Sequence, residues 1–228
     1  MAVKRTINPN VHPSIDNGRM NPEPVTLTVL PVTDAPATRQ APVVLWTDLI
    51  ANWHAKRAIE VAWAGGHSIR FLGTPNAQAQ ELAIYARSKG IDAVTVQACP
   101  CGHYGDPKRE CTCTLEMVTD WQAQYNQFAD IVIELADLKA ADIVSHLTHK
   151  FSGESEATVQ SRVDNAPKYT DPALDDAAHR LLEMAVRQMD LTPERVKSAL
   201  SVARTIANLS NDRTIAAQHI AEAIQYQR

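Results

Sequence analysis

Residues 69–96 read IRFLGTPNAQAQELAIYARSKGIDAVTV, and this run sets the architecture that we expect for the chain. Residues 69–72 predict a short strand, a turn follows at 73–76, and residues 77–89 predict a helix. Residues 93–96 predict the next strand. A strand, a helix and a second strand form a βαβ unit, which implies parallel pairing and a right-handed crossover.

The second strand of this unit leads directly into a segment that holds every cysteine of the chain. The cysteines form two pairs, Cys99 with Cys101 and Cys111 with Cys113. Paired thiolates at the two ends of a short, turn-rich loop, here residues 103–110, are the ligand set of a tetrahedral structural zinc site. Reduced core thiols and disulfides are the alternatives, and the paired spacing favours zinc. Four thiolates leave no position for water, so we expect a structural metal.

Regular structure is also expected on the N-terminal side of the unit. Residues 51–64 predict a helix capped by Asp48. Its buried face would be formed by Ile50, Trp53, Ala58, Ile59 and Ala62. Residues 1–44 are rich in Pro, Asn and Thr and predict an extended or disordered arm. Within it, apolar and polar residues alternate in the segment 25–30, which lies between Pro24 and Pro31. This pattern predicts a short strand, and the flanking prolines would suit the edge of a sheet.

The C-terminal side of the cysteine segment is expected to be mainly helical. The predicted elements are a helix at 115–126, a third core strand at 130–135, helical sequence at 140–165 with a break near 152–153, and helices at 171–188, 193–209 and 215–226. We therefore expect three parts, namely an arm (1–44), an α/β core (45–139) and a helical domain (140–228).

Composition limits the classes of protein to which the chain can belong. It has 228 residues, of which 45% are hydrophobic, enough to bury a core in one or two domains. A net charge of −4 argues against binding nucleic acid through overall charge, although not against a local basic patch. The sequence shows neither a secretory signal nor an apolar run of about 18 residues. We expect a cytoplasmic protein, whose cysteines hold metal in a reducing environment.

Some residues have both a chemical and an ordinary interpretation. His103 could be a further ligand, although four thiolates already complete the site. Lys56-Arg57 and Lys108-Arg109 could contact phosphate, but isolated basic pairs in an acidic chain are more typical of solvated surface. Trp46 is expected to pack in the core, and anchoring a partner protein is its alternative role.

Three blocks of sequence agree with one protein family, in the family's own order. They are CPCGHYGDP with CTC at 99–113, VARTIANLS at 202–210 together with HIAEAIQYQR at 219–228, and, more loosely, AKRAIEVAWAGGH at 55–67. These blocks resemble the cysteine knuckle C-P-C-G-Y-x-G-D-P with C-x-C, the C-terminal V-A-R-T-I-A-D-L with H-L-x-E-A-L-x-Y-R, and the helix before the P-loop. All three belong to the magnesium-chelatase-related AAA+ ATPases of the ComM/YifB type. His103 is an insertion relative to that pattern.

The resemblance implies an AAA+ architecture, with an α/β nucleotide-binding core, a helical lid and usually a ring assembly. The segment that carries the outer strands in the family is missing here, which would leave a three-stranded parallel remnant with residues 69–72 in the middle. Helices would have to cover both faces of so small a parallel sheet. We therefore expect a reduced AAA+-like three-layer core with a zinc knuckle at 99–113, followed by a lid bundle.

The same resemblance indicates that ATP hydrolysis has been lost. The family's P-loop is G-x-x-x-x-G-K-[ST], and residues 73–80 of this chain read GTPNAQAQ. Gln78, Ala79 and Gln80 thus replace the second glycine, the lysine and the hydroxyl residue that hold phosphate and Mg²⁺. No acidic Walker B strand is present. We predict a pseudo-ATPase, which is not an enzyme and has no cofactor-binding residues for nucleotide.

Other family positions support this prediction. Gln97 stands where the family has an Asn at the end of a strand, and Phe128 stands where the family has an Arg that reaches into a neighbour's site. Arg204 alone matches a nucleotide-facing position, and a salt bridge within the lid is its more ordinary role.

The sequence leaves three functions open. The first is a non-catalytic, zinc-containing interaction protein that associates with itself or with a partner protein. The second is a DNA-binding accessory module for recombination or DNA processing, a context inherited from the family, which would use the zinc knuckle with Lys108 and Arg109. The third is residual nucleotide binding, against which the missing lysine and acidic strand argue.

Overall fold

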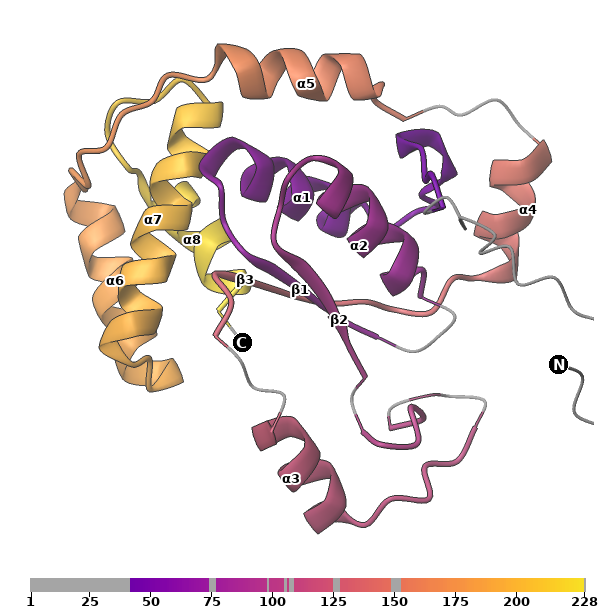
Figure 1. Cartoon of the computed structure of the whole chain (residues 1–228). Coiled ribbons are helices and arrows are strands. Elements are labelled where there is room, and N and C mark those ends of the chain that lie inside the picture. Colours follow the sequence, from indigo (N-terminus) through magenta and orange to yellow (C-terminus); the bar gives the residue numbers. More distant parts are fainter. Residues whose placement is uncertain are drawn as a thin grey trace, which may run out of the picture. The chain divides into compact units, whose positions relative to one another are not determined.

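The computed structural model describes residues 42–73, 77–97, 99–104, 106, 109–124, 128–148 and 153–227 (Figure 1). The elements in these ranges are η1 (Trp46–Asp48), α1 (Trp53–Gly65), β1 (Ile69–Leu72), α2 (Ala79–Ser88), β2 (Ala93–Val96), α3 (Leu115–Gln124), β3 (Ile131–Glu134), α4 (Ala140–Thr148), α5 (Glu156–Asn165), α6 (Asp176–Met189), α7 (Pro193–Leu209) and α8 (Ala217–Gln225). Most of the predicted arm, including its strand at 25–30, lies outside the described residues. No helix of the described ranges is long and apolar enough to cross a bilayer.

The three strands form one parallel sheet in the order β2-β1-β3. Ile69 of β1 is in register with Ala93 of β2 and with Ile131 of β3. The predicted three-stranded parallel sheet with residues 69–72 in the middle is therefore confirmed. The connection from β1 to β2 contains α2, and the return connection from β2 to β3 contains the cysteine segment and α3.

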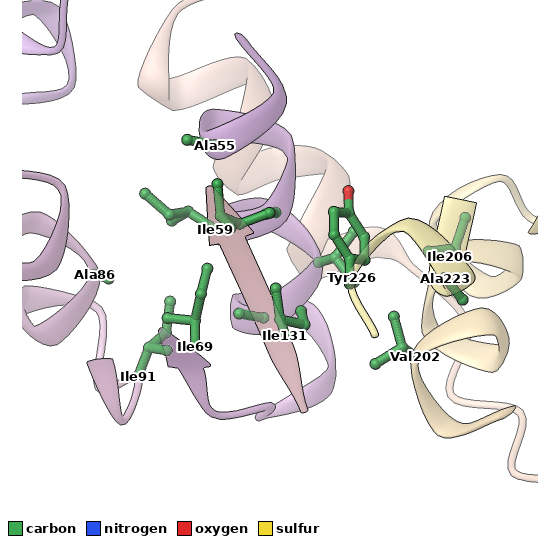
Figure 2. Close-up of a cluster of buried hydrophobic side chains, with 14 of the residues drawn as sticks. Ala55, Ile59, Ile69, Ala86, Ile91, Ile131, Val202, Ile206, Ala223 and Tyr226 are labelled. Atoms are coloured by element: carbon green, nitrogen blue, oxygen red, sulfur yellow. The ribbon is translucent and has the colours of Figure 1, made fainter. Parts of the chain in front are cut away.

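One face of the sheet carries the hydrophobic core. Ile69, Phe71, Ile131 and Ile133 alternate along β1 and β3 toward this face and are buried beneath α1 and α2 (Figures 1 and 2). The facing helices contribute Ala55, Ala58, Ile59, Ala62, Leu82, Ala83 and Ala86. Many of these residues are alanines, so the helix backbones can approach the sheet closely. Each large apolar side chain buried here contributes about 1.5–3 kcal/mol.

The core continues into the C-terminal helices. Val202 and Ile206 of α7, Ala223 of α8 and Tyr226 join the same buried cluster (Figure 2). A buried carboxylate, Glu60 of α1, accepts hydrogen bonds from Arg57 at 3.0 Å and from Arg162 of α5. These contacts position α5, α7 and α8 against α1.

The start of α1 differs from the prediction. Asp48 does not cap the helix, because its carboxylate accepts a hydrogen bond from the Leu45 N–H at 2.8 Å at the short helix η1. Asn52 takes the N-cap position instead, with a left-handed φ of 52°. This change of direction leaves Trp53 59% exposed, so its predicted burial is wrong, whereas the predicted burial of Ile59 is confirmed.

The start of α6 is also later than predicted. The sequence Asp171-Pro172 predicts a helix start, but α6 begins at Asp176 and Asp175 is its N-cap. The Asp175 carboxylate accepts from the Ala178 N–H at 2.7 Å. Leu174 forms a parallel bridge with Ile215, a long-range pairing that delays both α6 and α8.

Replacing Gly65 by alanine is expected to destabilise the fold by about 2 kcal/mol, because α1 and α7 meet too closely there for a side chain. A Cβ on Gly65 would lie 2.2 Å from Nε2 of His67 and 2.5 Å from Oγ1 of Thr205. These two atoms are already hydrogen-bonded to each other at 2.8 Å. Urea unfolding of Gly65→Ala measures the loss.

Gly66→Ala is the matched control for this prediction. Gly66 has a left-handed φ of 67°, but a Cβ there meets nothing within 4 Å. Backbone strain alone should then cost about 1 kcal/mol. A loss at Gly65 no larger than the loss at Gly66 would contradict the predicted clash.

Candidate metal centre

The four cysteines lie in the connection that follows β2. Two backbone hydrogen bonds shape its first turn. The Gly102 N–H donates to the Cys99 carbonyl at 3.0 Å, and the Tyr104 N–H donates to the Cys99 sulfur at 3.3 Å. Gly102 has a φ of 78°, which a glycine adopts without strain. This tight turn brings the Cys101 sulfur back beside that of Cys99.

The structure brings all four sulfur atoms together. They lie within 4.8 Å of one another, and Cys99 is completely buried. Cys99 Sγ lies 3.4 Å from Cys101 Sγ and 3.7 Å from Cys111 Sγ, and the last two are 3.6 Å apart. Four sulfurs at about 2.3 Å from a tetrahedral zinc would be about 3.8 Å apart. The separations therefore match a metal site and are too long for the disulfide alternative, and all four cysteines are free.

The pKa values of the cysteine thiols also bear on whether the cluster binds a cation. The pKa of the Cys101 thiol is lowered to about 5, because backbone hydrogen bonds from His103 and Thr112 stabilise its thiolate. The pKa of Cys111 is raised to about 12. A backbone hydrogen bond from Cys113 favours its thiolate, but desolvation and the contacts with Cys101 and Cys99 outweigh that bond. Four thiolates this close together require a neutralising charge, such as a bound metal ion.

His103, the possible extra ligand, is not part of this cluster. Its Nδ1 lies 3.6 Å from a carboxylate oxygen of Asp106, and the group of possible ligands among the described residues contains only the four cysteines. A site with four thiolates and no fifth donor has the chemistry of a structural metal rather than of a catalyst.

Residues 73–80 are those that the sequence resemblance aligns with the family's P-loop. Residues 74–76 lie outside the described residues. The side chain of Gln78 accepts from the Ile50 N–H at 2.7 Å and donates to the Asp48 carbonyl at 3.2 Å. Glu81 adds a carboxylate to the first turn of α2. That position stabilises the helix but repels a phosphate at its N-terminus.

Arg204 is buried within the C-terminal helices. Its guanidinium donates to the carbonyl oxygens of Arg213 at 2.6 Å, of Asp171 at 3.4 Å and of Asp212, and to the side chain of Asn208 at 3.1 Å. The side chain therefore holds the loops around α7 together. The predicted salt bridge is wrong, because the partners of Arg204 among the described residues are three carbonyl oxygens and the Asn208 side chain.

The helices that surround Arg204 also resemble a known protein family. Residues 149–227 match the family model described as magnesium chelatase, subunit ChlI C-terminal. This region is therefore similar to the C-terminal part of that subunit. It contains α5, α6, α7 and α8. No curated protein matches the chain.

Elsewhere in the chain, the structure corrects one prediction and confirms another. Lys56 is not solvated surface but is buried, and its Nζ donates to the Trp46 carbonyl at 3.3 Å. Burial lowers the pKa of Lys56 to about 8. Trp46 packs in the core as expected, with its ring 5.3 Å from that of Tyr85 and its Nε1 donating to the Glu154 carbonyl at 2.8 Å. The spacing of residues in the sequence does not predict the contact between Lys56 and Trp46, because it forms only when η1 and α1 pack together in the fold.

The remaining predicted positions fall in different places. Lys108 lies outside the described residues, and its neighbour Arg109 is exposed. The Gln97 carbonyl accepts from Nε1 of Trp121 on α3 at 3.0 Å. The ring of Phe128 lies 4.8 Å from the guanidinium of Arg195 on α7. None of these three described residues lies in the metal cluster.

Proposed function

We propose that this chain is a zinc-stabilised interaction protein, derived from a magnesium-chelatase-like AAA+ ATPase, that does not hydrolyse ATP. The relationship of residues 149–227 supports its origin. The parallel sheet followed by packed helices is compatible with a reduced AAA+-like core and lid. Association with itself or with a partner protein is the function proposed for this scaffold.

The arrangement around Gln78 is the observation that carries the proposal. Phosphate binding at this kind of turn needs free backbone amides, a lysine and a hydroxyl ligand for Mg²⁺. Here Gln78 is used to hold the segment at 48–50, and Ala79 follows it without charge. The carboxylate of Glu81 further opposes a phosphate. The described part of the turn thus favours a strand-to-helix connection over a nucleotide site.

Zinc is the metal proposed for the four cysteines. Thiolate ligands in tetrahedral geometry suit it, and a site closed by four of them stabilises structure without offering a position for substrate. The ion would join the end of β2 to the start of α3, a connection otherwise dominated by turns. We propose that the cysteine segment is a structural zinc knuckle.

An ATP titration tests the loss of nucleotide chemistry. We expect the zinc-loaded full chain to show no saturable heat with Mg-ATP by isothermal titration calorimetry, and no phosphate release. Its mass by light scattering should be the same with and without ATP. The triple variant Gln78→Gly, Ala79→Lys and Gln80→Thr restores the missing P-loop residue types and is the matched comparison. Saturable ATP binding or an ATP-dependent change of mass in the wild-type chain would contradict the proposal.

A further inference from the structure

The second face of the sheet is only partly covered. Arg70, Val94 and Val132 are in register across this face, opposite the Ile69 side. Val132 is buried, but Val94 is 43% exposed. Parallel sheets normally have helices on both faces. A right-handed crossover from β2 to β3 would place α3 here, yet α3 stands away from the sheet in Figure 1.

An unpaired cation lies on this face. Arg70 is only 5% exposed, and its buried Nε has no hydrogen-bond partner among the described residues. The pKa of Arg70 is lowered by burial and by the positive charge of Arg195 on α7. No carboxylate of the described ranges forms an ion pair with either arginine. Because an uncompensated buried charge is costly, this pair of guanidinium groups calls for an anion.

Two exposed apolar side chains lie beside the two arginines, Phe128 next to Arg195 and Val94 next to Arg70. Arg195 donates to the Ala129 carbonyl at 2.9 Å and stacks over the ring of Phe128, which is 52% exposed. Together with Val94, this ring makes the surface amphipathic rather than simply basic. Such a surface suits a polypeptide that carries both carboxylates and apolar side chains. It lacks the run of cations that a nucleic acid would need.

Helix α3 has the complementary chemistry. Glu116 and Asp120 lie one turn apart on its exposed side, and the helix contains no lysine or arginine. Neither carboxylate has an ion-pair partner among the described residues, and like charges at this spacing destabilise a helix. Leu115, which is 76% exposed, and Met117 flank Glu116. Two carboxylates with apolar neighbours thus match two guanidinium groups with apolar neighbours.

We propose that the Arg70–Arg195 pair is a docking site for the Glu116–Asp120 side of α3 from a second copy of this chain. The inference rests on the self-association proposed above and assigns the residues that carry it. The chain's own α3 is held at the C-terminal end of β2 by the hydrogen bond from Trp121 to the Gln97 carbonyl. Its exposed side is therefore available to another molecule, and the contact can be reciprocal between two copies.

Charge reversal on each side of the contact tests this proposal in the zinc-loaded full chain. Sedimentation velocity over a concentration series should show a wild-type dimer that weakens with added salt. Arg195→Glu, and separately Glu116→Lys with Asp120→Lys, should each weaken dimerisation by about 100-fold or more, because like charges then face each other. An equimolar mixture of the two variants should dimerise again. Lys197→Glu is the matched control on the exposed surface of α7.

The outcomes separate this inference from the proposed function. Loss of the dimer in both variants, with recovery in the mixture, supports the contact. A dimer that resists both reversals overturns the contact but leaves self-association intact. Variants that remain monomeric when mixed overturn it too, because the two groups then do not face each other. A wild-type chain that is monomeric at every concentration overturns both this inference and self-association, and shifts the proposed function to a different partner protein.

Discussion

Replacing Cys99 by serine is expected to reduce bound zinc from one ion per chain to none and to unfold the segment from 99 to 113. Cys99 is the completely buried ligand, and its sulfur contacts those of both Cys101 and Cys111. Structural zinc sites contribute about 10–16 kcal/mol to the folding of isolated zinc-finger peptides, so the loss of one ligand should be decisive for this loop. Elemental analysis of metal content, with limited proteolysis at Arg109, measures both effects.

His103→Ala is the matched control for the zinc prediction. His103 lies in the same turn but outside the sulfur cluster, so the variant should keep its zinc and its resistance to proteolysis. A chelator applied to the wild-type chain should reproduce the effect of Cys99→Ser in the loop. Equal zinc content in Cys99→Ser and the wild type would contradict the assignment of the ligands. Zinc loss in His103→Ala would mean that the histidine is a ligand after all.

Arg204→Met is expected to lower the free energy of unfolding by about 3 kcal/mol or more. The methionine fills most of the volume but donates nothing, so the carbonyls of Asp171, Asp212 and Arg213 lose their common donor. These hydrogen bonds are part-buried, and a hydrogen bond that involves a charged group contributes about 1.5–3 kcal/mol to stability. Chemical denaturation, followed by circular dichroism of the helices, measures the change.

Arg213→Met is the control for this prediction, because Arg213 is exposed and stacks against the same ring, that of Tyr169. Its loss should change the stability by no more than about 0.5 kcal/mol. Arg204→Lys should fall between the two, since one ammonium group cannot reach every acceptor. Equal stability of Arg204→Met and Arg213→Met would show that the carbonyl contacts are not needed.

Local patterns in the sequence were sufficient for the strands and for most of the helices. The strands at 69–72 and 93–96 and the helix at 193–209 are bounded by turn or cap residues that act within a few positions. The grouping of the four cysteines is local for the same reason, because all of them lie within one short loop. The order of the parallel sheet came from the family resemblance and from the rule of right-handed crossovers.

Contacts between distant segments decided the remaining features. Trp53 is exposed because Asn52 turns the chain into α1 after η1, and α6 starts late because Leu174 pairs with Ile215. That Arg70 lies beside Arg195, with no ion-pair partner among the described residues, follows only from how distant segments pack. The sequence by itself determined the strands and the grouping of the four cysteines, since both depend on near neighbours. Tertiary structure alone decided which lysine and arginine side chains have hydrogen-bond or ion-pair partners, because those partners come from elsewhere in the chain.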